Sequence, residues 1–247
     1  PVVSNQLLSY YPAIRASAFN HAIKMSEIKY RNERVVSAGR IELEENSFDS
    51  NRLFYASPDL DLPVTRVVQG EVQQLNPTLL AACASGKHAG FGNTATPLTN
   101  KNLTGFNMPT DKKSPKLDLD RIIRQGFMPI QARASGGLVT RGRTSSLSGD
   151  PRLEEISLQR TVDYISKNSR RLVENAFVGS NIVQGLLTDI RTTVQQYLNS
   201  LESISSGTVT NVSVDSRDPR QINIEIDYTP LFPLNSLQIS FNLVATI

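Results

Sequence analysis

The chain lacks several residue types and patterns on which whole classes of protein depend. Its 247 residues include one cysteine, Cys83, and no tryptophan, and only 6% are aromatic. A single cysteine can form neither an internal disulfide nor a cysteine-based zinc site. No apolar run approaches the roughly 20 residues of a membrane-spanning helix, and no signal-peptide pattern opens the chain. We therefore expect a folded protein with a buried thiol, made in a reducing cytoplasm and bound to no membrane.

Motifs for catalysis and for nucleotide or metal binding are also missing. The chain contains no H-E-x-x-H, G-x-S-x-G or G-x-G-x-x-G motif. The stretch "CASGKHAG" includes Gly86 and Lys87, but it lacks the upstream glycine and the following Ser or Thr of a phosphate-binding loop. The end of a helix is the better interpretation of that stretch. We expect no cofactor, no metal site and no enzymatic activity.

Two other functions remain open from the sequence alone. A hydrolase could use a Ser/His/Asp set around His21 or His88, although no residue is marked as a nucleophile. A nucleic-acid-binding loop could use Arg133, Arg141 and Arg143, although no aromatic residues for base stacking lie between them. The formal net charge is only +3, so we expect any electrostatic role to be local.

The first half of the chain gives a weak secondary-structure signal. Hydrophobic spacing, β-branched runs and Gly/Pro breaks are the available guides. They predict a helix or two within 7–30, a short strand within 34–45, a loop over 46–63 and a strand ending at Gly70. A buried helix over 76–90 and a surface connection over 90–116 follow. The last predicted elements are a short helix, a turn at Gly126, a strand through Ile130 and a loop at Gly136 and Gly137. We expect this α/β region, residues 1–149, to be a separate domain.

Two amphipathic helices are predicted in the second half. In the first, a spacing of 3.6 residues per turn gives one apolar face and one basic face. The apolar face carries Leu158, Val162, Ile165, Leu172 and Ala176, and the basic face carries Arg160, Lys167 and Arg171. After Gly179, Ser180 is placed to cap a second helix whose apolar residues run from Ile182 to Leu201.

Three alternating runs follow the helices and predict strands at 209–214, 222–228 and 237–243. We therefore expect an α+β fold in which residues 150–247 form a helix pair packed on a small antiparallel sheet. The last run lies near the end of the chain, where a strand is free to pair with another molecule.

Residues 150–247 resemble the C-terminal domain of tail sheath proteins from contractile-tailed bacteriophages and related injection machines. The resemblance is carried by Arg160 with "VDYI", the "FVGSN" junction, the long helix to Leu201, the Gly-Thr-Val strand start and the closing "IEIDYTPLFPLNSLQISFNL". It extends loosely back to about residue 76.

The resemblance implies a structural subunit that polymerises as stacked rings around an inner tail tube and contracts to drive the tube through the host envelope. The implied partners are copies of itself, the tube protein, the baseplate and the tail terminator, with no nucleic acid and no membrane. The implied location is the virion tail, assembled in the cytoplasm of a bacterial host. A sheath-like baseplate or collar component is the alternative.

The resemblance also implies two sets of contact residues. The first set belongs to the exchange of terminal strands between subunits. It implies that residues 237–244 are either the exchanged strand or its receiving neighbour and that residues 222–228 form part of the receiving sheet. The contact residues implied are Ile222, Ile224, Ile226, Tyr228, Leu237, Ile239, Phe241 and Leu243. Attachment to the tube through a basic helix implies Arg160, Lys167, Arg170 and Arg171. An exchanged N-terminal strand is not evident, so either that arm is missing here or the sheath is compact.

Overall fold

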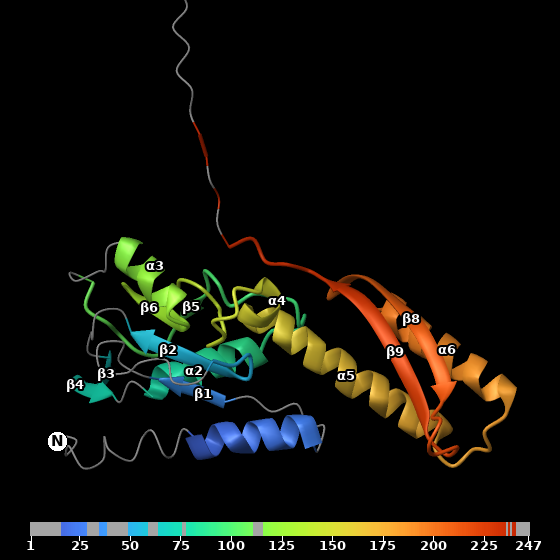
Figure 1. The fold of residues 1–247 in the computed structure, drawn as a ribbon. Coiled ribbons are helices and arrows are strands. Elements are labelled where there is room, and N and C mark those ends of the chain that lie inside the picture. The colour runs from blue at the N-terminus through green and yellow to red at the C-terminus, as the bar shows by residue number, and fades with distance from the viewer. Residues whose placement is uncertain are drawn as a thin grey trace, which may run out of the picture.

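A computed structural model describes residues 16–28, 35–38, 49–58, 64–75, 78–110, 116–235, 237 and 239–240. These residues form two groups of elements joined by the long helix α5 (Ile156–Phe177) (Figure 1). The N-terminal group contains a mixed sheet with helices, and the C-terminal group contains α6 (Gln184–Asn199) and a long hairpin. The α+β prediction is confirmed. None of the helices among the described residues is long and apolar enough to cross a membrane.

The N-terminal sheet has five strands in the order β1-β2-β6-β7-β5. Its strands are β1 (Val35–Ala38), β2 (Leu53–Pro58), β6 (Phe127–Arg133), β7 (Gly136–Val139) and β5 (Asn102–Leu103). β1, β2 and β6 are parallel, whereas β6, β7 and β5 are antiparallel.

A separate hairpin joins β3 (Val64–Val68) to β4 (Glu71–Leu75). The sequence predicted the first of these strands, ending at Gly70, but not the second. Gln69 and Gly70 both have positive φ, which a two-residue hairpin turn favours.

Side-chain alternation divides the core between the two faces of the five-stranded sheet. Leu53 and Phe127 face one side, where they meet Ile122 of α3 (Lys116–Arg124) and Phe19 of a helix over residues 16–23 that continues into the π-helix η1 (Lys24–Ile28). The opposite face packs against α2 (Thr78–Ala89) through Phe54, Ala56, Met128, Ile130, Leu80, Ala81 and Ala84. The predicted helix over 76–90 is thus confirmed for residues 78–89.

Two of the first-half predictions are wrong. The segment 46–63, expected to be a loop, contains β2, which lies between β1 and β6. Its Asn, Asp, Ser and Pro residues conceal a short strand whose Leu53 and Ala56 are fully buried. The segment 90–116 is not purely a surface connection, because Leu98 and Phe106 are buried in the core.

The C-terminal group is a helix on a two-stranded antiparallel sheet. α6 packs its Ile190, Val194 and Leu198 onto the hairpin of β8 (Ile204–Val214) and β9 (Ile222–Pro230). The predicted strands at 209–214 and 222–228 are confirmed. The predicted third strand is not present as a strand at residues 237, 239 and 240, and residues 241–243 lie outside the described part of the chain.

The junction between α5 and α6 differs from its prediction. Gly179 has φ +100° and ends the turn after α5, but α6 begins only at Gln184. Its N-cap is Val183, which makes no side-chain capping bond, so the predicted cap at Ser180 is wrong. The short helix α4 (Pro151–Glu154) precedes α5 and is capped by the side chain of Asp150.

Gly136 should not tolerate a side chain, whereas Gly86 should. Gly136 has φ +103°, and a Cβ added there would lie 2.0 Å from the carbonyl oxygen of Leu103 in β5. We expect Gly136→Ala to lower the free energy of unfolding by at least about 2 kcal/mol. Gly86→Ala, in the open on α2, should raise it by about 0.5–1 kcal/mol. Urea denaturation measures both, and equal effects would contradict the tight β5–β7 packing.

Candidate assembly surfaces

The segment that follows β9 leaves the fold as an extended arm. In Figure 1 it runs from β9 past α4 and then away from the body. Its apolar side chains are open to solvent: Phe232 is 54% exposed, Leu234 82%, Leu237 75% and Ile239 62%. Contiguous apolar side chains left in water mark an interaction site. This arm, residues 231–240, contains the predicted exchange residues Leu237 and Ile239, while Phe241 and Leu243 lie outside the described residues.

The predicted receiving residues lie together on β9. Ile222, Ile224, Ile226 and Tyr228 alternate with exposed residues and pack, half-buried, against the core beneath α6. Their side chains therefore hold the hairpin to α6. Within one chain these β9 residues do not contact the described residues of the arm, because the arm runs away from β9 (Figure 1).

Part of the backbone of β8 is already bonded to α6. The Gln195 side chain donates to the carbonyl of Gly207 at 2.8 Å and accepts from the amide of Val209 at 3.0 Å. Arg191 donates to the carbonyl of Val209 at 2.8 Å. These side chains occupy hydrogen-bonding groups that an added strand needs. The middle of β8 is therefore a poor place for strand addition.

The predicted basic face of α5 is only partly present. Lys167, Arg170 and Arg171 lie on the exposed surface of the second half of α5, with Arg170 4.0 Å from Glu174. Arg160 does not join them. Its Nη2 donates to the carbonyls of Phe91 at 2.8 Å and Ala89 at 3.3 Å, and burial lowers its pKa.

Arg160 therefore satisfies carbonyl groups at the C-terminal end of α2, where a cation is favoured. A tube contact for Arg160 stays a prediction, but in this structure its guanidinium faces the N-terminal group and not the exposed side of α5. We call the remaining three, Lys167, Arg170 and Arg171, the basic surface of α5.

The start of α5 is more enclosed than amphipathic spacing predicted, because residues 156–161 are all buried or half-buried. Leu158 and Ile165 are buried as expected, but Val162 is 36% exposed and Ala176 is exposed. Polar side chains are buried in their place: Ser157, Gln159, Thr161, Asp163 and Ser169.

Buried polar pairs tie α5 to the start of β2. Arg52 lies 2.5 Å from Asp163, with side-chain exposures of 15% and 7%, and Asn51 donates to Gln159 at 2.7 Å. Breaking a buried ion pair leaves an uncompensated charge, so such a pair resists separation. Ile156 belongs to the N-terminal core and Ile165 to the C-terminal core, so α5 links both groups. The domain boundary at residue 149 stays a prediction.

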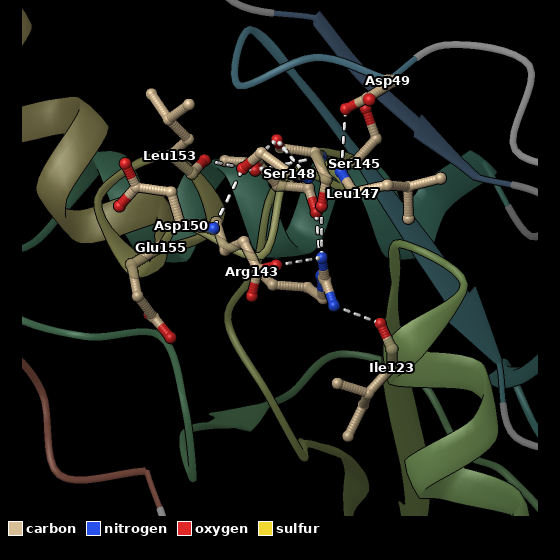
Figure 2. Close-up of polar contacts among 12 residues, drawn as sticks. Asp49, Ile123, Arg143, Ser145, Leu147, Ser148, Asp150, Leu153 and Glu155 are labelled. Carbon is tan, nitrogen blue, oxygen red and sulfur yellow. Dashed lines mark hydrogen bonds and ion pairs between the residues drawn. The ribbon is translucent and has the colours of Figure 1, made fainter.

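The loop before α4 is held by a buried arginine (Figure 2). Arg143 is 4% exposed and donates to the carbonyls of Ile123, Thr144 and Ser146, with Glu154 3.5 Å away. Burial lowers the pKa of Arg143, opposed by Glu154. An arginine keeps its charge in such a site and supplies several donors at fixed angles.

This role of Arg143 contradicts the nucleic-acid hypothesis. Arg133 is exposed, but Arg141 is paired with Glu155 at 3.0 Å and Arg143 is enclosed. The three guanidinium groups therefore do not form one exposed phosphate-binding surface.

The hydrolase hypothesis gains no support from the two histidines. His88 is 5% exposed near the end of α2, with its ring edge-on to Phe91 at 6.3 Å. A general base must reach the substrate, which this burial prevents. His21 lies on the exposed side of the N-terminal helix. Within the described residues no group of three His, Cys, Asp or Glu side chains is placed to hold a metal ion.

Glu155 was missed by the sequence analysis and lies where the N-terminal group meets the arm. Its side chain is 2% exposed, and its Oε1 accepts from Arg141 Nε at 3.0 Å and from Asn235 Nδ2 at 2.6 Å. Burial raises the pKa of Glu155, while Arg141 and Asn235 oppose the shift. An isolated Glu before a helix carries no sequence signal for such a contact, since its partners are 14 and 80 residues away.

The raised pKa of Glu155 predicts a pH dependence of stability. The Glu155 carboxyl group binds its proton more tightly in the folded protein than in the unfolded chain. The folded protein therefore loses stability as the pH rises through the range above the ordinary pKa of a glutamate. Glu155→Gln cannot titrate. Relative to this variant, the wild type should therefore lose free energy of unfolding as the pH rises above about 4. Chemical denaturation at each pH measures the difference, with the exposed Glu225→Gln as control. A difference that grows in favour of the wild type would contradict the prediction.

Comparison with known proteins agrees with this architecture. No family model matches the chain. The chain is 25% identical over 194 residues to the tail sheath protein of Bacillus phage SP01, which covers 75% of this chain and 33% of that protein. It therefore spans about a third of the length of this curated relative.

Solved structures share the fold at low sequence identity. A chain from the baseplate of the anti-feeding prophage has a TM-score of 0.69 at 14% identity, covering 90% of this chain and 63% of that one. The sheath tail protein of Desulfitobacterium hafniense has a TM-score of 0.64 at 14% identity, covering 89% and 54%. A chain of the contracted helical sheath of the anti-feeding prophage has a TM-score of 0.63 at 15% identity, and the match covers 83% of this chain and 60% of that one. The chain is therefore a homologue of a phage tail sheath protein and has the fold of sheath proteins from contractile injection systems.

Proposed function

We propose that this chain is a structural, non-enzymatic subunit of a contractile tail sheath. It polymerises with copies of itself as stacked rings around an inner tail tube, and contraction of the rings drives the tube through the host envelope. The relationship to the phage SP01 sheath protein supports the class of particle. The observation that carries the proposal is the arm, which exposes Leu234, Leu237 and Ile239 and pairs with no strand among the described residues.

Strand addition to β9 is the contact that this arm suits. β8 and β9 form a sheet of only two strands, and an isolated two-stranded hairpin is marginally stable. An incoming strand that pairs with β9 gains main-chain hydrogen bonds and buries alternate apolar side chains. The middle of β8 is occupied by Gln195 and Arg191, which favours β9, with its Ile222 to Tyr228, as the receiving strand.

The basic surface of α5 suits the second contact, with an acidic surface of the inner tube. Exposed ion pairs contribute about 0–1 kcal/mol each. Repetition over many subunits makes such an array strong while each link stays breakable, as contraction requires. The baseplate and the tail terminator are further partners of this assembly, in a phage tail built in the cytoplasm of a bacterial host.

A sheath-like baseplate or collar component is the second candidate. The specific observation in its favour is the TM-score of 0.69 to a chain in a baseplate structure, which covers 90% of this chain. Such a component uses the same arm and the same receiving strand but closes a single ring. Electron microscopy of assembled protein distinguishes the two, because a sheath forms long hollow tubes and a baseplate component forms single rings.

Removal of the residues after Asn235 should abolish assembly without unfolding the subunit. We expect the full chain to form rings or tubes at high concentration under negative-stain electron microscopy, and a chain ending at Asn235 to stay dispersed. Because Leu237 and Ile239 are exposed, the truncated chain should keep its melting temperature within about 2 °C. Dispersed particles from both chains would contradict the proposal.

Leu237→Asp tests whether assembly needs the apolar side chain of Leu237, because this substitution leaves the length of the arm unchanged. Val72→Asp is the matched control, because Val72 is 70% exposed and Leu237 is 75% exposed, but Val72 lies on the β3–β4 hairpin. Only Leu237→Asp should impair assembly. An equal loss in both variants would mean that added charge alone prevents assembly.

Charge reversal on α5 should weaken binding to an acidic partner. With polyglutamate as the probe, NMR shift changes in the wild type should centre on the basic surface of α5. Lys167→Glu with Arg171→Glu should weaken the apparent affinity about five- to tenfold, since each pair contributes at most about 1 kcal/mol. Arg66→Glu with Arg217→Glu, at two other exposed sites, is the control. Shift changes that centre elsewhere would remove α5 from the proposed contact.

A further inference from the structure

One side chain ties the arm to the N-terminal group. Asn235 Nδ2 donates to Glu155 Oε1 at 2.6 Å, and Asn235 Oδ1 accepts from Thr99 Oγ1 at 3.0 Å. Thr99 Oγ1 in turn accepts from the backbone amide of Gly142 at 2.9 Å. Both ends of the Asn235 amide are therefore bonded. Their partners, Thr99 and Glu155, are 56 residues apart in the sequence.

The partners of Asn235 are themselves fixed. Glu155 is 2% exposed, accepts from Arg141 at 3.0 Å and stands at the junction of α4 and α5. Gly142 approaches the loop at Leu98 so closely that an added Cβ would lie 3.0 Å from the Leu98 Cβ. The amide of Asn235 thus binds a site whose donor and acceptor are already oriented, which lowers the entropy cost of the contact.

Leu234 and Leu237, on either side of Asn235, lack comparable support. Leu234 is 82% exposed and Leu237 is 75% exposed. Among the described residues of 231–240, Asn235 is the one with side-chain hydrogen bonds to the body of the subunit. The direction in which the arm leaves the subunit therefore depends on this contact.

We propose that Asn235 is a positioning residue that fixes where the arm leaves the subunit and so presents residues 237 onward to a neighbouring copy. This inference rests on the proposed strand exchange. A strand tethered at a fixed point samples fewer conformations than one that swings from Pro230, so its effective concentration at the receiving β9 is higher. The anchor speeds exchange without being part of the exchanged strand.

Distance measurement on the dispersed chain tests the anchor. In a Cys83→Ala background, spin labels at Leu234→Cys and Leu147→Cys, both exposed positions, report the distance between the arm and the loop before α4. The unaltered Asn235 should give one narrow distance distribution, and Asn235→Ala a distribution at least about twice as wide. Asn223→Ala, an exposed asparagine of β9, should leave it narrow. A broad distribution with Asn235 intact, or a narrow one in Asn235→Ala, would overturn the anchor.

A swap of hydrogen-bonding groups guards against an effect of misfolding. Asn235→Asp places a second carboxylate against Glu155 and should broaden the distribution. Adding Glu155→Gln supplies an amide donor to that carboxylate and should narrow it again. Failure of the double variant to narrow the distribution would contradict a specific Asn235–Glu155 contact.

Light scattering then tests the positioning role. Asn235→Ala should assemble about tenfold more slowly than the wild type while its melting temperature is unchanged. Assembly at the wild-type rate despite broadened distances would overturn the role. If the wild type itself does not assemble, the proposed strand exchange fails and the positioning role fails with it, whereas the distance measurement still decides whether the anchor exists.

Discussion

The arm after β9 is apolar, and its described residues pair with no strand of their own chain. The C-terminal sheet stops at two strands, and the arm that follows them carries Leu234, Leu237 and Ile239 into solvent. Burial of such side chains is worth about 25 cal/mol per Å² of apolar surface, and unpaired strand edges favour pairing. A partner that supplies the missing edge satisfies both demands. A second copy of the same chain carries both the arm and β9, so the contact can repeat from subunit to subunit without a separate partner.

A mesh of shared sheets needs a stiff connection from each sheet to the body of its subunit. α5 provides that connection, because its first half buries polar side chains that bond to the body as well as apolar ones. The Arg52–Asp163 pair, the bonds from Arg160 to the end of α2, and the site around Glu155 hold it to the N-terminal group. Its far end packs with α6 and β9. In the proposed sheath, α5 is therefore the main element that would transmit displacement of the C-terminal sheet to the body.

Sequence patterns predicted the elements whose signal is local. The alternation of Ile222, Ile224 and Ile226 predicted β9, and helical spacing predicted α5 and α6. Patterns failed where long-range contacts decide the outcome. β2 was taken for a loop because its polar neighbours outweigh a six-residue strand whose burial comes from β1 and β6. Arg160 was grouped with Lys167 and Arg171 because helix periodicity cannot show that the end of α2 lies beside it. The contacts of Glu155 with Arg141 and Asn235 arise only from the tertiary fold.

Amide hydrogen exchange in dispersed and assembled protein tests most directly whether the C-terminal sheet is completed by another copy. Fast exchange of the arm beyond Asn235 is expected in the dispersed chain, because its described residues, 237, 239 and 240, belong to no strand. After assembly the same amides, and the outward-facing amides of β9, should become protected together. An assembled particle in which the arm exchanges as fast as in the dispersed chain would show that subunits associate through other surfaces, and the strand-exchange account would be wrong.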